Sequence, residues 1–290
     1  MFFKNALVGV YPEDTDLSGL AAALEQDQFT PCTSLQVQST GWVPVEEELV
    51  YAAGVYRFLR FAIEKRGVPS TARDDLLAVR IAELAEKQGF MPGKKAVKEL
   101  KEQVVDELLP RALPTRRIIN VMIDTTRRRV IIDTSSAATS ELILKSLFKH
   151  AALEVNTAPG LGRLLNELVL GQDDPAFTVD DEFSLQLAGN KKTLVRYQAA
   201  GDDTTSEAQR HIAGGATVTS VALTYDAKVS FVLQSTGALR SIKPTDLMKE
   251  HAKDAKEFEA TCLLGGQLLS DLLDEIYQAA RDAAPAEEAA

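Results

Sequence analysis

GKKAVKELKEQVVDELLPRALPTRRIINVMIDTTRRRVIID, residues 93–133, is the stretch that decides the fold. Its first part spaces apolar side chains three and four residues apart, as one face of a helix does, and that pattern stops at Pro110. Two apolar runs bordered by arginines follow, over residues 116–124 and 128–133, and the polar residues between them favour a turn. We therefore expect an amphipathic helix that leads into two paired strands.

A second helix is expected just before this one, from Pro69 to about Gln88, with a turn over residues 89–93. Two helices joined by a short turn predict an antiparallel hairpin, which we expect to protrude from a sheet body. Periodicity elsewhere predicts strands at 2–11, 51–65 (a hairpin turning at 53–54), 153–156, 182–187, 193–197, 217–225, 228–234 and 239–242, and helices at 16–26, 138–149, 161–170 and 254–281.

The order of these elements is typical of a split α+β sheet unit. We expect an α+β protein with antiparallel sheets, built as an elongated, multi-lobed subunit. Its expected domains are a central α+β domain (1–69 plus 112–172), a helical-hairpin tip (70–111) and a C-terminal base domain with a long final helix (173–290).

Charge is unevenly distributed along the chain. Residues 56–129 contain 17 Lys or Arg and 10 Asp or Glu, about +7, although the whole chain carries -10. The remaining residues hold 15 basic and 32 acidic side chains, or -17. Because a polyanion responds to the field of one face rather than to the total charge, this segregation favours a basic surface that binds a polyanion.

Composition limits the other possibilities. A chain of 290 residues with 45% hydrophobic content can bury a large core. Cys32 and Cys262 are isolated, which excludes a disulfide framework and favours a reducing cytoplasm. No apolar run of about 18 residues occurs, so we expect a soluble intracellular protein with no membrane contact. His150, His211 and His251 lack ligand spacing, and no phosphate-binding or dinucleotide motif is complete, so no metal and no cofactor are expected.

The basic segment supplies the candidate DNA contacts. Lys94, Lys98 and Lys101 fall within an arc of roughly 60° beside the apolar face of their helix. A solvated helix face would look the same, but three consecutive arginines in a turn repel one another and favour a nearby polyanion. The strongest candidates for contacts to duplex phosphates are Lys94, Lys95, Lys98, Lys101, Arg111, Arg116, Arg117, Arg127, Arg128 and Arg129, followed by Lys191, Lys192, Arg196 and Lys228.

Two alternatives stay open. Asp124 and Asp133 end neighbouring strands, and residues 180–182 form an acidic cluster, which are the ligand types of a metal-dependent nuclease. Aspartates at strand ends also commonly accept hydrogen bonds from turn N–H groups, so we expect no catalytic residue. The other alternative is a protein-interaction module whose helical hairpin docks on an acidic partner.

Several motifs occur together and in order: FFKNALVGVY at 2–11, FTPC at 29–32, GWVP at 41–44, ELLPRA at 107–112, IDT at 123–125, VIID at 130–133 and VSFVL at 229–233. This combination resembles the bacterial recombination-associated RdgC family across nearly the whole chain. The resemblance implies a non-enzymatic, nucleoid-associated protein whose two subunits close into a ring around duplex DNA, bind without sequence specificity and restrain RecA-promoted strand exchange.

The resemblance also implies basic side chains lining the ring and two separate subunit contacts. Leu113 stands where the family usually has a phenylalanine that serves one of those contacts. Phe90, Met91 and Pro92 stand where the family tends to carry basic residues. These departures imply a weaker or shifted set of DNA contacts.

Overall fold

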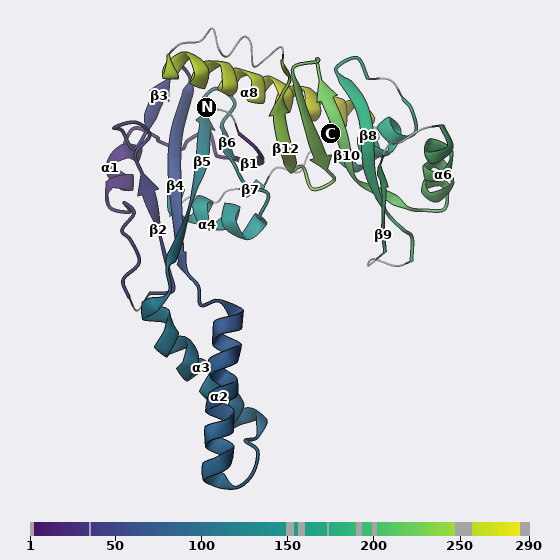
Figure 1. Cartoon of the computed structure of the whole chain (residues 1–290). Helices are drawn as coiled ribbons and strands as arrows, with labels where there is room; N and C mark the ends of the chain where they lie inside the picture. The colour runs from purple at the N-terminus through teal and green to yellow at the C-terminus, as the bar shows by residue number, and fades with distance from the viewer. Residues whose placement is uncertain are drawn as a thin grey trace. The chain divides into compact units, whose positions relative to one another are not determined.

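The computed structural model describes residues 3–34, 36–148, 154–155, 160–172, 174–189, 193–198, 202–246 and 257–284. Strand pairs in both sheets are antiparallel and helices accompany them, which confirms the α+β class (Figure 1). The chain divides into two compact units. Unit 1 comprises Met1–Ser18, Val50–Leu59 and Asn120–Ala290, and unit 2 comprises Gly19–Leu49 and Arg60–Ile119.

Strand β4 (Tyr56–Arg66) and strand β5 (Pro114–Asp124) each have residues in both units. They belong to a sheet of strand order β2-β4-β5-β6-β1-β7, and β3 pairs with β4 outside this order. The remaining strands of this sheet are β1 (Leu7–Val10), β2 (Gln38–Val43), β3 (Tyr51–Ala53), β6 (Arg129–Ile132) and β7 (Glu154–Val155). The expected hairpin at 51–65 and the pair on either side of residues 125–128 are both confirmed.

Strand β2 in unit 2 was not expected from the sequence. It pairs with β4 from Gln38 opposite Lys65 to Val43 opposite Arg60. Gly41 lies in the middle of β2, where a glycine ordinarily weakens a strand. A Cβ added to Gly41 would lie 2.5 Å from backbone atoms of Phe29, so the segment before β2 approaches too closely for any side chain. Gly41 weakens the strand pattern in the sequence, but the close approach of the Phe29 backbone to β2 requires a glycine at this position.

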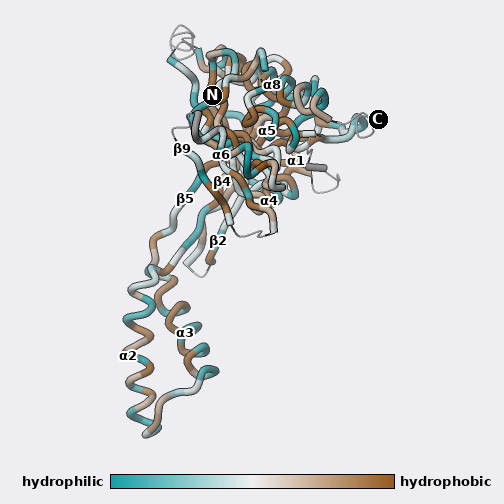
Figure 2. The backbone as a smooth tube through the Cα atoms, turned by 90° about the vertical axis from the view of Figure 1, so that its right-hand side faces the viewer, coloured by the Kyte–Doolittle hydropathy of each residue, from teal (hydrophilic) through white to brown (hydrophobic). Residues whose placement is uncertain are grey.

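Two consecutive helices follow β4 in unit 2, α2 (Ser70–Gln88) and α3 (Lys94–Leu108), and the short helix η1 (Leu109–Arg111) leads from them into β5. They lie side by side in both views, and polar and apolar residues alternate along each (Figures 1 and 2). An ion pair of 3.1 Å between Arg80 and Glu107 joins them. No residue of α2 is buried, and Val104 is the only buried residue of α3. The pair therefore keeps most of its surface in contact with solvent. Unit 2 also contains the short helix α1 (Leu20–Glu25).

Unit 1 contains the second sheet, of order β12-β11-β10-β8-β9. These strands are β8 (Phe177–Gln186), β9 (Leu194–Gln198), β10 (Thr217–Tyr225), β11 (Val229–Gln234) and β12 (Leu239–Pro244), and the helices of unit 1 are α4 (Ala137–Leu147), α5 (Leu161–Val169), α6 (Asp202–Ala213) and α8 (Phe258–Ala283). Nearly all of them fall close to their expected positions. The expected start of α8 at residue 254 lies outside the described residues.

Helix α8 supplies much of the apolar packing of unit 1. It extends from beside β3 along the second sheet (Figure 1). Leu269, Leu272, Leu273 and Ile276 of α8 are all buried. A Cβ added to Gly266 would lie 2.8 Å from the ring of Tyr56, so this glycine lets the helix approach β4 closely. The helix is thereby brought next to the turn between β5 and β6.

Candidate nucleic-acid interface

The predicted lysines of α3 are exposed. Lys94 and Lys95 occupy the first turn of the helix, which contains no acidic residue. Lys98 approaches Glu102 at 3.9 Å, the outer limit of an ion pair, and both side chains are mostly in water. Among the described residues, Lys94, Lys95 and Lys101 have no ion pair. Because no described carboxylate lies within ion-pair distance of them, these lysines are available to phosphates.

Arg116 and Arg117 are neighbours in β5 with different surroundings. Consecutive residues of a strand point to opposite faces of the sheet. Arg116 lies 2.9 Å from the Glu64 carboxylate and its guanidinium stacks 4.5 Å from the centre of the Phe29 ring. Arg117 is exposed and has no ion pair within the described segments. The same holds for Arg111 in η1. Of the two β5 arginines, Arg117 is therefore the better placed to bind a ligand.

Glu64 is almost completely buried, yet it carries a charge. The N–H of Cys32 donates a hydrogen bond of 2.8 Å to Oε1, and Arg116 donates one of 2.9 Å to Oε2. The backbone hydrogen bond from Cys32 and the pairing with Arg116 outweigh desolvation and lower the pKa of Glu64. Arg116 thus neutralises the buried carboxylate of Glu64 within unit 2.

The three consecutive arginines of the β5–β6 turn have separate roles. Arg127 contacts three carboxylates, those of Asp124 at 3.3 Å, Asp271 at 3.2 Å and Asp274 at 2.5 Å. Arg129 lies 2.7 Å from Asp274 and 4.8 Å from the centre of the Tyr277 ring. Asp271, Asp274 and Tyr277 belong to α8. Arg127 and Arg129 therefore fasten the turn to the helix.

Their burial supports this structural role. The side chains of Arg127 and Arg129 are 26% and 13% exposed, compared with 44% for Arg128. Burial lowers the pKa of Arg127, but the hydrogen bond to Asp274 and the charges of Asp274 and Asp124 outweigh it, so the pKa is raised. A phosphate would have to displace these carboxylates before it could bind. Arg128, whose one ion-pair partner among the described residues is the exposed Glu13 at 3.0 Å, is the accessible member of the three.

The second-rank candidates lie in unit 1 or outside the described residues. Arg196 pairs with Glu182, and Lys228 pairs with Asp226. Lys191 and Lys192 lie outside the described residues.

Sequence reasoning missed two exposed lysines of unit 2. Lys65 at the end of β4 and Lys87 in the last turn of α2 are exposed, and neither has an ion pair in the described part of the chain. Their position inside the basic segment 56–129 was the available signal.

The aspartates of the nuclease alternative hold backbone turns. Asp124 is completely buried and accepts hydrogen bonds from the N–H groups of Thr126 and Arg127, both at 3.0 Å, and from Oγ of Ser270 at 2.7 Å. Asp133 accepts hydrogen bonds from the N–H groups of Lys4 at 3.0 Å and Asn5 at 2.9 Å. Within the described ranges, no group of three or more His, Cys, Asp or Glu residues is placed to hold a metal ion.

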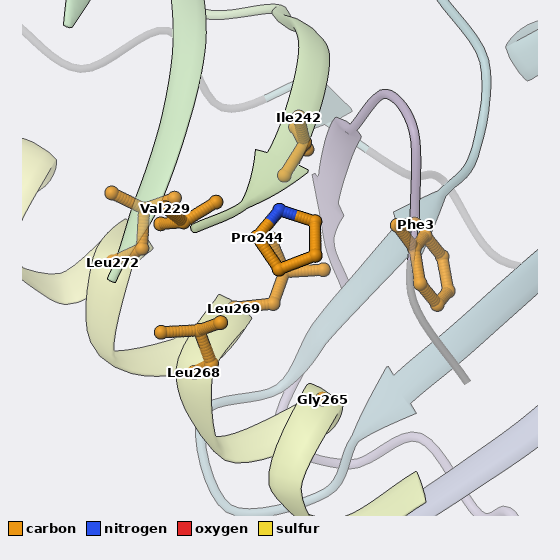
Figure 3. Close-up of a pocket in the computed structure, with 8 residues that line it drawn as sticks. All are labelled: Phe3, Val229, Ile242, Pro244, Gly265, Leu268, Leu269 and Leu272. Atoms are coloured by element: carbon orange, nitrogen blue, oxygen red, sulfur yellow. The ribbon is translucent and has the colours of Figure 1, made fainter. Parts of the chain in front are cut away.

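A cavity of about 20 Å³ lies between α8 and strands β11 and β12 (Figure 3). Its lining is apolar and consists of Phe3, Val229, Ile242, Pro244, Gly265, Leu268, Leu269 and Leu272. A single water molecule needs about 10–15 Å³ of such volume, so this space is a packing gap and not a ligand site.

Leu113, the expected subunit contact, is 85% exposed in the segment between η1 and β5. An apolar side chain this accessible on a single chain is compatible with a contact to another molecule. None of the helices in the described part of the chain is both long and apolar enough to cross a bilayer.

Comparison with known proteins gives one consistent result. A family described as "Putative exonuclease, RdgC" matches residues 1–282. The chain is 34% identical over 297 residues to the recombination-associated protein RdgC of Janthinobacterium sp. (strain Marseille), covering 96% of this chain and 97% of the relative. It is 34% identical to the protein of the same name from Cupriavidus pinatubonensis, over 96% and 98% of the two chains, and 32% identical to that of Dechloromonas aromatica, over 96% and 97%.

Proposed function

Because the chain belongs to the RdgC family, whose relatives are named recombination-associated proteins, we propose that it acts in homologous recombination by binding double-stranded DNA without sequence specificity. The observation that carries the proposal is a set of exposed cations in unit 2 with no ion pair among the described residues: Lys65, Lys87, Lys94, Lys95, Lys101, Arg111 and Arg117. We call this set the free cations.

The free cations suit phosphates better than bases. Long, mobile lysine side chains neutralise phosphate charge and release counterions, which produces salt-sensitive binding that is the same for all sequences. A single-strand stacking platform needs several exposed aromatic side chains, but of Phe58, Phe61 and Phe90 in the basic segment only Phe90 is exposed. Duplex DNA is therefore the proposed ligand.

The proposed assembly is a homodimer that closes into a ring around the duplex. Leu113 supports it as an apolar side chain open to a second copy. The net charge of -10 is compatible with encirclement if the free cations line the hole and the acidic residues face outward. A protein that occupies the duplex in this way would restrain RecA-promoted strand exchange and associate with the nucleoid.

The test compares binding to linear and covalently closed circular duplex DNA across a salt series, with the molar mass measured on the same sample. We expect a dimer whose binding weakens steeply with salt, is indifferent to sequence and persists longer on closed circles. A monomer, or equal lifetimes on the two DNA forms, would contradict the ring. Absence of binding at low salt would contradict DNA binding itself and favour the protein-interaction alternative.

The family description favours exonuclease activity as a second candidate. Incubation of end-labelled linear duplex with Mg²⁺ or Mn²⁺, with EDTA in a parallel sample, distinguishes the two. We expect intact DNA in every sample. Metal-dependent release of labelled nucleotides that copurifies with the protein would replace the binding proposal by the enzymatic one.

A further inference from the structure

The turn between α2 and α3 presents two large apolar side chains to solvent. Phe90 is 66% exposed and Met91 is 72% exposed. A glycine lies on each side of the pair: Gly89 ends α2 in the left-handed region at φ 77, and Gly93 precedes α3 with an extended backbone. Pro92 fixes a further φ angle within the turn. The apolar pair is therefore presented to solvent by a short turn between the two helices.

Cations surround this apolar pair. Between Lys87 and Lys98 the sequence contains four lysines and no acidic residue. Lys87, Lys94 and Lys95 are exposed and have no ion pair in the part of the chain that the structure describes. Glu86 directly precedes this run and Glu99 directly follows it. A partner for this surface must combine negative charge with an apolar interior that two side chains can enter.

Duplex DNA satisfies both requirements. Its phosphates attract the lysines, and proteins that contact the minor groove commonly insert Phe, Leu, Ile, Met or Pro between base pairs. Residues 90–92 are three consecutive members of that group. An anionic lipid surface also attracts lysines, but interfacial binding strength scales with buried apolar area, and two side chains offer little of it. The continuation of free cations to Arg111 and Arg117 also favours a long, charged ligand.

We propose that Phe90 and Met91 form an apolar wedge that enters between neighbouring base pairs of the duplex, while Lys87, Lys94 and Lys95 contact the flanking phosphates. This inference rests on the proposed DNA binding and adds a contact to the bases. It predicts that the protein favours duplexes that unstack easily, because pyrimidine–purine steps and mismatches require less energy to open than stiff A-tracts. The preference is for deformability and not for a sequence read by hydrogen bonds.

The experiment measures base unstacking directly. A duplex that carries 2-aminopurine beside a TA step is titrated with the wild type and with the double variant Phe90→Ala, Met91→Ala. We expect a severalfold rise in fluorescence on saturation by the wild type and no rise with the double variant. Val79→Ala is the matched control, because Val79 is an exposed apolar residue of α2 outside the turn, 52% exposed, and this variant should retain the rise. A mismatched duplex should bind about tenfold more tightly than an A-tract to the wild type only, because a mismatched base unstacks at a lower energy than a base of a stiff A-tract.

Each contrary result identifies a different failure. Saturable DNA binding by the wild type without a fluorescence rise would overturn the wedge and leave the proposed function intact. Absence of DNA binding would overturn both. A lower molar mass of the double variant would show that the turn contacts a second copy instead. Sedimentation with vesicles of phosphatidylcholine and phosphatidylglycerol that depends on Phe90, without a fluorescence rise, would assign the turn to lipid.

Discussion

The arginines of the β5–β6 turn and the lysines of α3 are equally basic in sequence and differ in what surrounds them. Arg127 and Arg129 face Asp124, Asp271 and Asp274, and their charges stabilise unit 1 internally. The lysines of α3 face solvent, and the one ion pair that they form with a described residue is the weak contact between Lys98 and Glu102. A positive charge is useful to a polyanion only if no carboxylate already holds it. The run of three arginines, the more conspicuous pattern, is therefore the weaker candidate.

The largest expected effect comes from removing the lysines of α3. Replacing Lys94, Lys95, Lys98 and Lys101 by Gln should weaken duplex binding about 1,000-fold near 0.1 M salt, because each lost phosphate contact removes about 0.9 from the salt slope. Fluorescence anisotropy with a labelled duplex measures it. The control removes the same charge from four ion-paired cations of unit 1, Lys145, Arg163, Arg196 and Lys228. Equal losses of duplex affinity in the two variants would show that free and ion-paired cations contribute alike to DNA binding.

The second prediction concerns the paired arginines. Arg127→Met leaves Asp124 completely buried without its cation, and it should lower the free energy of unfolding by about 1–2 kcal/mol, between the values for exposed and buried ion pairs. Urea unfolding measures it. The folded variant should bind duplex DNA with an unchanged salt slope. Arg128→Met is the matched control and should leave stability nearly unchanged. Loss of DNA affinity by the folded Arg127 variant would show instead that Arg127 contacts DNA.

The neighbouring arginines of β5 sharpen the comparison within a single strand. Arg117→Gln should reduce the salt slope of DNA binding by about 0.9 and leave stability unchanged, since it removes one free cation. Arg116→Gln should lower the denaturation midpoint and leave the slope unchanged, since Arg116 pairs with Glu64. Both variants lose one positive charge, so each controls for the other. The reverse assignment of the two effects would place the ligand on the opposite face of β5.

The smallest expected effect is a pH dependence from Glu64. Its pKa is lowered below the ordinary 4.5, so its contribution to stability is complete above that pH and is lost as the pH falls through the folded-state value. The denaturation midpoint of the wild type should therefore fall more steeply on acidification than that of Glu64→Gln. Glu86→Gln, at an exposed position of α2, is the matched control. Identical acid profiles for the wild type and Glu64→Gln would exclude this contribution.

Local patterns predicted the fold well. Helices α2 and α3 are confirmed because Gly89 and Gly93 mark the ends that face the turn, and the β5–β6 pair is confirmed because its apolar runs end at polar residues. Strand β2 escaped prediction because the reason for Gly41 is the backbone of Phe29, a contact that periodicity does not encode.

The candidate site was only partly predictable for the same reason. Arg127 and Asp274 are 147 residues apart, and Glu64 and Arg116 are 52 apart. The sequence shows which side chains are charged, but their ion-pair partners come from elements that meet only in the fold. The exposure of Leu113, Phe90 and Met91 has the same origin, since apolar residues in the sequence are ordinarily expected in a core.

The most direct test of the account is the salt dependence of binding to two duplexes of unrelated sequence. If the lysines of α3 contact phosphates, the logarithm of the binding constant should fall linearly with the logarithm of the salt concentration, with a slope of about -4 or steeper on both sequences. The variant that lacks these four lysines should give a clearly shallower slope. A slope near zero, a slope that differs between the two sequences, or no binding at low salt would contradict phosphate-directed DNA binding by unit 2.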